Sequence, residues 1–326
     1  FLPERATSMG PIPLIRASGA RMFVPFLERI GAPVQSLWTR AGLPPRSFQE
    51  EESLVPLRHV LRFAEEAAHA EGVPHLGALV AQHSGLSSSS EFVRRISRAR
   101  TLAEAFATAQ ALVPGHNSGA RYWVARQGEE VRICRRMSAD RVATRQADLL
   151  TVSLMVEIVR RAAGSDWRPR EASFQSSGHE RLSELGILGD ARITEGRPAT
   201  SITLPRSFLA LRLGRPPGTD RAPRYDRWLA TAPPRDFAES ARVLVRSLLP
   251  LGSASVEAAA DAALLSVRTL QRRLAEEGAS YSRIVDVVRL DLACRMLEGG
   301  KLKLIEIAYE LGYSDPAHFT RAFRRW

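Results

Sequence analysis

The sequence predicts an α+β N-terminal domain followed by an all-α C-terminal domain with two helix-turn-helix units joined by a long helix. Over most of residues 14–113, apolar residues recur at three- and four-residue spacing, and alternation replaces this spacing from Ala120. Beyond Asp236 only helical spacing occurs, and one helix-turn-helix plan appears twice. With 326 residues, of which 44% are hydrophobic, the chain is long enough to bury two cores.

The N-terminal helices are expected at three segments that carry apolar residues on one face. These are VPFLERI (24–30), LRHVLRFAEEAAHA (57–70) and TLAEAFATAQALV (101–113). Glycine and proline interrupt the helical pattern at 31–33, 43–45 and 113–115, and helices are expected to break there. The polar run SGLSSSSE (84–91) is expected to be a loop that caps a helix at Glu91.

The second half of the N-terminal domain is expected to combine a sheet with one long helix. Residues 120–137 predict a hairpin of two strands around a Gln127–Gly128 turn. A helical pattern covers 148–164, and three short strands follow at 170–177, 191–196 and 199–205. These elements place the N-terminal domain at 12–205.

A linker is expected at 206–235, before a C-terminal domain at 236–326. Proline and glycine recur through 211–236, and continuous apolar periodicity fails there, as is typical of an interdomain connection. We expect this joint to change when the two domains rearrange.

The net charge of +11 favours a polyanionic partner, but the charge is not concentrated where the helix-turn-helix repeat lies. Residues 253–326 contain 11 basic and 10 acidic residues, whereas 205–252 contain 9 and 4. An argument for DNA binding must therefore rest on where particular arginines point.

Two cysteines, Cys134 and Cys294, stand 160 positions apart and outside any CxxC pair, which favours a reducing compartment and excludes a disulfide framework or a cysteine-based zinc site. No window reaches the roughly 18 uninterrupted apolar residues of a spanning helix, and the first ten residues do not have the pattern of a secretion signal. We expect a soluble cytoplasmic protein without a membrane partner. The start at Phe1 rather than Met indicates a processed or trimmed segment.

The internal repeat pairs a short helix, a tight turn and an arginine-bearing helix in each of two units. Ala260 corresponds to Ala308 at an offset of 48, and Leu270 corresponds to Phe319 at an offset of 49. The alanines let two helices cross closely, and the serines that end the turns, or the aspartate in the second, can cap the next helix. Asp315 followed by proline predicts the start of the second arginine-bearing helix.

The free face of each arginine-bearing helix follows from the 100° rotation per residue. In the first unit, Val267, Leu270 and Leu274 are expected to pack inward, which leaves Arg268, Thr269 and Arg272 outside. In the second, Phe319, Ala322 and Phe323 pack inward, and the outward residues are Ala317, His318, Arg321 and Arg324. Such a face suits the major groove, where an arginine can bind a guanine edge.

A helix of about 18 residues is expected at 281–300, between the two units. Its length of roughly 27 Å could hold the two reading helices about one DNA turn apart, on one side of the duplex.

The C-terminal motifs resemble the signature of the AraC/XylS family of bacterial transcription regulators. They cover about the last 90 residues and include RLDLACRML (289–297) and IEIAYELGYSDPAHFTRAFRRW (305–326). The resemblance implies base-reading positions in both units, namely Arg268, Gln271, Arg272, Pro316, Ala317, His318 and Arg321. The helical wheel places Gln271 nearer the edge of that face.

Two departures from this family pattern concern the first turn and the C-terminus. The first unit has Leu264-Leu265 where the family usually has a glycine. Relatives usually continue past the position of Trp326 with a glycine-containing turn and a short helix, so we expect a frayed or truncated end.

The N-terminal domain resembles the arabinose-binding-type sensor domain of one branch of that family. The segments 101–113, the Trp123 hairpin and 166–213 occur in the expected order. The resemblance implies a small-molecule effector of unknown identity, promoter DNA as partner, a possible homodimer and contact with RNA polymerase.

Alternative interpretations remain for the N-terminal domain. It could serve only dimerisation or partner contact in an effector-independent DNA-binding protein, or it could be an enzyme with an appended DNA-binding module. No nucleophile elbow, paired carboxylates or metal-like histidine spacing supports catalysis, a metal site or a cofactor. Tyr122, Trp123, Trp38 and Phe92 could line a pocket, or could be ordinary core residues.

Overall fold

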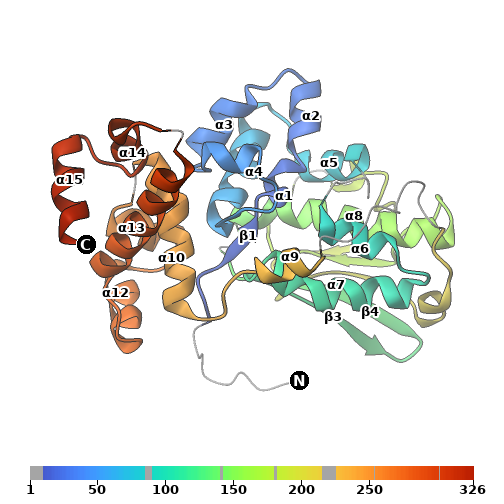
Figure 1. Cartoon of the computed structure of the whole chain (residues 1–326). Helices are drawn as coiled ribbons and strands as arrows, with labels where there is room; N and C mark the ends of the chain where they lie inside the picture. Colours follow the sequence, from blue (N-terminus) through green and yellow to red (C-terminus); the bar gives the residue numbers. More distant parts are fainter. Residues whose placement is uncertain are drawn as a thin grey trace.

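The computed structural model describes residues 10–84, 90–139, 142–179, 182–214, 225–252, 254–300 and 302–326. Within them, an α+β domain is followed by helices alone, as the sequence predicts. Figure 1 shows the sheet and its helices on one side of the molecule and the C-terminal helices on the other. Among the described residues no single helix is long and apolar enough to cross a membrane, although a bent pair, Phe237–Leu251 with Val256–Ala262, passes that test jointly.

In the described part of the chain, the main sheet has five strands in the order β3-β4-β7-β5-β6, with only the β5–β6 pair parallel. The strands are β3 (Ala120–Gln127), β4 (Glu130–Met137), β5 (Glu171–Ser173), β6 (Arg192–Thr194) and β7 (Thr200–Pro205). The predicted hairpin is present, but its turn is one residue later than expected. Gln127 pairs with Glu130, and Gly128, at φ +60°, takes the first loop position, which requires the left-handed conformation of a tight hairpin turn.

Helices pack beside this sheet and build two apolar cores. Their bounds are α1 (Ser18–Arg21), α2 (Val24–Arg29), α3 (Val34–Arg40), η1 (Pro45–Phe48), α4 (Leu57–Ala70), α5 (Leu76–Ser84), α6 (Glu91–Ser97), α7 (Leu102–His116), η2 (Val142–Thr144), α8 (Arg145–Ala163) and η3 (Leu182–Glu184). One core lies between α7, α8 and the sheet around Phe106 and Phe174, and the other surrounds Trp38 and Phe63 within α1–α5. Ser90 caps α6 as predicted, and residues 85–89 of the predicted loop lie outside the described part.

Two features of the N-terminal domain differ from the sequence expectations. A two-stranded sheet, β1 (Leu14–Arg16) with β2 (Leu54–Pro56), was not predicted because each strand has only three residues. The expected break at 113–115 is wrong, because α7 continues through Pro114 to His116. Pro114 removes only one hydrogen bond of the final turn, and the Arg16 side chain holds that turn by donating from Nε to the Gly115 carbonyl at 2.9 Å.

The C-terminal helices form the predicted pair of helix-turn-helix units. They are α10 (Phe237–Leu248), η5 (Leu249–Leu251), α11 (Val256–Ala262), α12 (Val267–Glu276), α13 (Tyr281–Gly299), α14 (Leu304–Glu310) and α15 (Pro316–Arg325). Ser266 and Asp315 each accept a backbone N–H at a helix start, which confirms the predicted caps, and Ser255 caps α11 in the same way. Ala260 and Ala308 are buried where the helices of each unit cross.

The turns of the two units both contain a residue with positive φ, but that residue differs between them. Gly312 has φ +78° in the second unit, and Leu264, 48 positions earlier, has φ +60° in the first. Leu264 is the one non-glycine residue with positive φ in the described part of the chain. The left-handed conformation costs an L-residue roughly 1–2 kcal/mol. The first turn therefore keeps the backbone conformation of the second despite the missing glycine, and Leu264 is strained.

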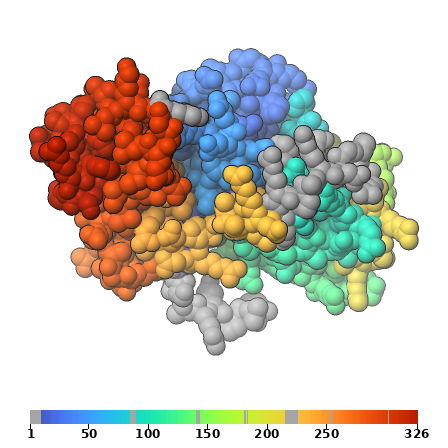
Figure 2. Space-filling model, viewed as in Figure 1, coloured from blue at the N-terminus to red at the C-terminus, as the bar shows by residue number. Residues whose placement is uncertain are grey.

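The segment predicted as a linker contains two helical turns, η4 (Arg206–Ala210) and α9 (Tyr225–Ala230). Residues 215–224 of this segment lie outside the described part. In Figure 2 the gold segment of α9 lies across the front of the molecule, beside the blue and teal N-terminal elements. The domains also contact each other directly. Ile12 N donates to Ser240 Oγ at 2.9 Å, and Arg58 Nη2 lies 2.8 Å from Asp261 Oδ1.

We predict that Leu264→Gly raises the free energy of unfolding by about 1 kcal/mol, because glycine adopts positive φ without the steric cost. Thermal or urea unfolding of the full chain measures the change. Leu265→Gly, at a neighbouring position whose φ is not positive, is the control and should be destabilising. A lower stability for Leu264→Gly would contradict strain in this turn.

Candidate nucleic-acid interface and ligand cavity

The predicted reading face of α12 is free of the rest of the monomer at its charged positions. Arg268, Gln271 and Arg272 are exposed, whereas Leu270 and Leu274 on the other face are fully buried. The Arg272 Nε atom lies 3.7 Å from a carboxylate oxygen of Glu276 on its own helix. Thr269 differs from the rest, because it is half-buried and its Oγ1 lies 2.8 Å from Ser266 Oγ at the cap.

The reading face of α15 is arranged in the same way. Ala317, His318 and Arg321 are exposed, and Phe319 is buried on the opposite side. Pro316 is half-buried at the first helical position, where it fixes the start of the helix. The Asp315 carboxylate caps the helix by accepting from Ala317 N at 2.8 Å. In Figure 1, α12 and α15 lie on the side of the C-terminal domain away from the sheet, with α13 beside them.

Two other arginines of the repeat have structural roles that the sequence did not reveal. Arg273 donates to the Gly10 carbonyl at 2.7 Å and its guanidinium lies 3.7 Å from the centre of the Phe237 ring, so it joins the first unit to the N-terminal segment. Arg289 on α13 donates to the Leu311 carbonyl at 3.2 Å and lies over the Tyr313 ring, which fixes the second turn against the long helix. Both contacts join residues too far apart in sequence for a local pattern to indicate.

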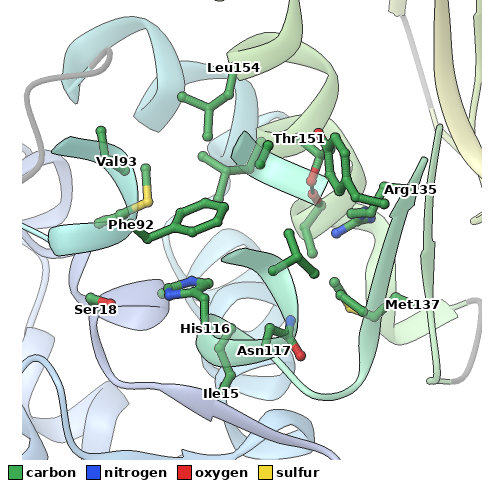
Figure 3. A pocket seen from close by; sticks show the side chains of 18 of the residues that line it. Ile15, Ser18, Phe92, Val93, His116, Asn117, Arg135, Met137, Thr151 and Leu154 are labelled. Atoms are coloured by element: carbon green, nitrogen blue, oxygen red, sulfur yellow. Dashed lines mark hydrogen bonds between the residues drawn. The ribbon is translucent and has the colours of Figure 1, made fainter. Parts of the chain in front are cut away.

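The N-terminal domain contains a partly open cavity of about 170 Å³ between α4, α6, α7, α8 and the first strands of the main sheet. Most of its wall is apolar, and Figure 3 shows Phe92, Val93, Met137 and Leu154 around it. Of the four aromatic residues considered from the sequence, Phe92 and Tyr122 line this cavity, whereas Trp38 is a buried core residue. Trp123 is not among the lining residues and has Arg121 beside its ring.

Three buried polar atoms in residues of this wall have no hydrogen-bond partner in the described part of the chain. They are Ser18 Oγ, His116 Nδ1 and Arg135 Nε. An unpaired buried polar group costs about 1–3 kcal/mol, and such atoms also occur away from this wall, for example His59 Nδ1 and Arg132 Nε. The wall therefore combines a large apolar area with a few unsatisfied polar groups, which is typical of a small-molecule site.

Arg135 is the charged residue of the wall, and the Asp148 carboxylate on α8 balances its charge. Its Nη2 donates to Asp148, whose carboxylate also accepts from Ser176 N at 2.8 Å and from Thr200 Oγ1 at 2.6 Å. These bonds fix both side chains, which are almost completely buried.

Burial shifts the pKa values of two titratable residues in the wall, His116 and Tyr122. It lowers the pKa of His116 to about 3, with the nearby Arg16 cation acting in the same direction, so the imidazole is neutral at physiological pH. Burial also raises the pKa of Tyr122, which stays a neutral phenol. His116 stacks on Phe92 with ring centres 4.6 Å apart.

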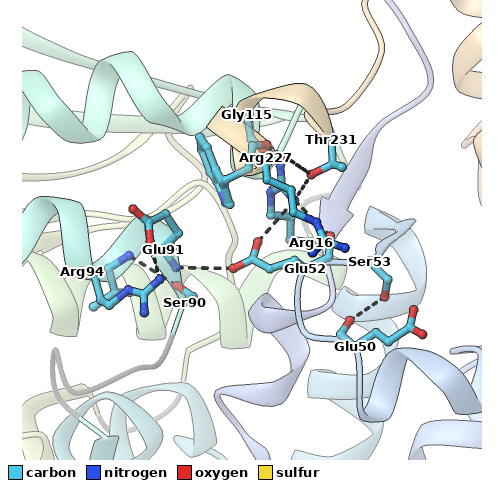
Figure 4. Close-up of polar contacts among 12 residues, drawn as sticks. Arg16, Glu50, Glu52, Ser53, Ser90, Glu91, Arg94, Gly115, Arg227 and Thr231 are labelled. Carbon is cyan, nitrogen blue, oxygen red and sulfur yellow. Dashed lines mark hydrogen bonds and ion pairs between the residues drawn. The ribbon is translucent and has the colours of Figure 1, made fainter. Parts of the chain in front are cut away.

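A cluster around Arg16 connects this cavity to α9. The Arg16 guanidinium, which is fully buried, donates to the carbonyls of Gly115 and Trp228 at 2.9 and 2.6 Å and to Thr231 Oγ1 at 3.2 Å, and it lies over the Trp228 ring. Glu52 balances its charge at 3.3 Å. Figure 4 shows Arg16 on β1, Glu52 in the segment before β2, Gly115 at the end of α7 and Thr231 directly after α9.

A cavity in the N-terminal domain and exposed helix-turn-helix faces in the C-terminal domain are the arrangement expected of a DNA-binding regulator with a ligand-binding domain. The model of the arabinose-binding N-terminal domain of AraC transcription regulators matches residues 31–213, and a helix-turn-helix domain model matches 259–326. The chain therefore belongs to the AraC family of transcription regulators, a family of DNA-binding regulators and not of enzymes.

Similar proteins include regulators from two bacteria. The HTH-type transcriptional regulator VirS of Mycobacterium tuberculosis is 28% identical over 96% of this chain and 94% of its own length. The ornithine utilization regulator of Pseudomonas aeruginosa is 39% identical over 28% of each chain. The crystal structure of the regulator CdpR from Pseudomonas aeruginosa covers 95% of each chain with 20% identity and a TM-score of 0.41.

We predict that His116 makes the protein less stable as the pH falls below about 6.5. Between pH 6.5 and about 3, the unfolded chain binds a proton at this position that the folded chain does not, so stability decreases by up to roughly 1.4 kcal/mol per pH unit. His59, whose pKa burial lowers to about 4, adds a second contribution of the same sign.

Urea unfolding between pH 7 and 4.5 measures this slope, and His116→Phe should make it shallower. His69→Phe, at an exposed position, is the control and should leave the slope unchanged. An identical slope in His116→Phe and the unaltered protein would contradict the buried neutral imidazole.

Proposed function

We propose that this protein is a transcription regulator in which a small molecule in the N-terminal cavity controls how α12 and α15 engage promoter DNA. The observation that carries the proposal is the combination of two exposed, capped helices with a largely apolar cavity in the N-terminal domain that has one charged residue, Arg135, in its lining. The cavity favours effector control over the alternative in which the N-terminal domain serves only dimerisation or partner contact. Action in the cytoplasm, formation of a homodimer and contact with RNA polymerase remain predictions.

The two helices are proposed to read successive major grooves. Arg268, Gln271 and Arg272 would contact bases from α12, and Ala317, His318 and Arg321 would do so from α15, with Thr269 and Pro316 at the helix starts close to the backbone. The helix α13 has 19 residues, which corresponds to about 28 Å, so it can separate two reading helices by a distance near one DNA turn. The exposure of the arginines supports this assignment, because a buried guanidinium could not reach a base.

Effector binding is proposed to act through the last turn of α7. His116 lines the cavity, while the preceding residue, Gly115, faces the Trp228 ring so closely that an added Cβ would lie 2.9 Å from it. A ligand that displaces His116 would therefore also displace Gly115, on which the Trp228 ring of α9 packs. Six residues separate α9 from α10, whose buried face belongs to the core of the C-terminal domain, so a shift of α9 changes the position of the first unit.

We predict that Arg321→Ala weakens binding to the preferred DNA sequence by about 1–3 kcal/mol and relaxes discrimination at the bases it contacts. The preferred sequence is obtained by selection from random duplexes, and titrations compare it with a scrambled duplex. Arg325→Ala is the control, since Arg325 faces Asp286 at 4.0 Å, and its effect should be smaller. Equal losses on both duplexes would show that Arg321 contacts only phosphate.

We predict that Trp228→Leu removes the response to the effector without removing DNA occupancy, because Trp228 lies on α9 and not on a reading helix. A reporter driven by the footprinted promoter, read across growth conditions, measures the response, and footprinting measures occupancy. Trp123→Leu, on the hairpin outside the cavity, is the matched control. A Trp228→Leu variant that responds like the unaltered protein would contradict this route of coupling.

A further inference from the structure

The chemistry of the cavity wall restricts what the effector can be. No aspartate, glutamate or lysine is among the residues that line the cavity in the described part of the chain. The charged residue there is Arg135, and Arg16 acts on His116 from nearby. An ammonium group would lose its hydration in this cavity without gaining an anionic partner, so a cationic ligand is excluded by its desolvation cost.

A sugar does not fit this wall either, although the matched family carries arabinose in its name. A pentose has hydroxyl groups around its whole circumference, and each one needs a hydrogen-bond partner once it is buried. Seven polar side chains are among the lining residues, but most of the accessible surface of the wall is apolar, with Phe92, Phe106, Leu150 and Leu154 in its lining. Most of the hydroxyl groups of arabinose would face carbon.

The size of the cavity restricts the apolar part of the ligand. An apolar cavity of about 150 Å³ in another protein accommodates benzene, so about 170 Å³ accepts a ring or branched chain of about six to eight carbons. One polar group on this body can be satisfied by Arg135, which is the charged residue of the wall and whose side chain extends toward the cavity in Figure 3. A carboxylate is the group that gains most from a guanidinium.

We infer that the effector is a compact monocarboxylic acid with an apolar body of about six to eight carbons, bound with its carboxylate at Arg135 and its body between α6, α7 and α8. Ser18 and His116 are also lining residues, on the α1 and α7 side of the same wall. This inference rests on the proposed function for its biological meaning, but the binding itself does not depend on DNA.

The test compares four probes of similar size on the full chain by calorimetric titration and by thermal unfolding. The probes are cyclohexanecarboxylate, cyclohexylmethanol, cyclohexylamine and arabinose. Cyclohexanecarboxylate should bind at least tenfold more tightly than cyclohexylmethanol, and it should raise the unfolding temperature in a concentration-dependent way. The amine and the sugar should not bind. Tighter binding of the amine or of arabinose, or no binding of the carboxylate, would overturn the inference.

Substitutions locate the binding. Leu154→Phe fills the cavity and should abolish binding, whereas Leu229→Phe, the same change at an exposed position, should leave the affinity unchanged. Arg135→Lys keeps a cation beside Asp148 but removes Nε, and should lower the affinity for the carboxylate at least tenfold with little effect on the alcohol. Unchanged binding in Leu154→Phe would overturn the site, and this readout remains if Arg135→Lys does not fold.

The outcomes separate this inference from the proposed function. If arabinose occupies the cavity and changes DNA affinity, effector control stands and the ligand class is wrong. If cyclohexanecarboxylate and its larger homologues bind in the cavity but none of them changes the affinity for the selected DNA, the ligand class stands and effector control fails.

Discussion

The burial of the Arg16 guanidinium is the interaction on which the arrangement of this protein depends. A cation without solvent costs several kcal/mol unless ion pairs and hydrogen bonds compensate for the lost hydration. Burial lowers the pKa of Arg16, and Glu52 acts against this shift. The remaining compensation comes from the carbonyls of Gly115 and Trp228, so β1, the end of α7 and α9 must be together for the charge to be tolerated.

This requirement joins the ligand cavity to the C-terminal helices without a long chain of contacts. The last turn of α7 has His116 on the cavity wall and Gly115 against α9, so this one turn contacts both the cavity and α9. Glu52 extends the cluster to the start of α6, where its carboxylate accepts from Glu91 N at 3.4 Å. A ligand needs to displace this turn only slightly to alter the set of bonds that holds α9, and a difference in affinity between the two arrangements is what control requires.

Local features of the fold could be predicted from the sequence, whereas the features that connect distant segments could not. The caps at Ser255, Ser266 and Asp315 and the inward faces of α12 and α15 follow from neighbouring residues, and the structure has them. The contact between Arg16 and Trp228 joins positions 212 residues apart, and neither residue stands in a recognisable motif. The same reason explains why α9 and the role of Arg273 were not predicted and why, of the lining residues, only Phe92 and Tyr122 were considered from the sequence. The missing glycine at Leu264 was a visible departure from the family pattern, but the positive φ of that turn is known only from the structure.

Hydrogen exchange of the full chain with Arg16→Met tests the central claim most directly, because methionine keeps most of the apolar volume and removes the charge and its donors. The account predicts that amides of α9 and of the last turn of α7 lose protection, while those of α13 keep it. Unchanged protection of α9 in Arg16→Met would show that this helix is held without the guanidinium and would contradict the account.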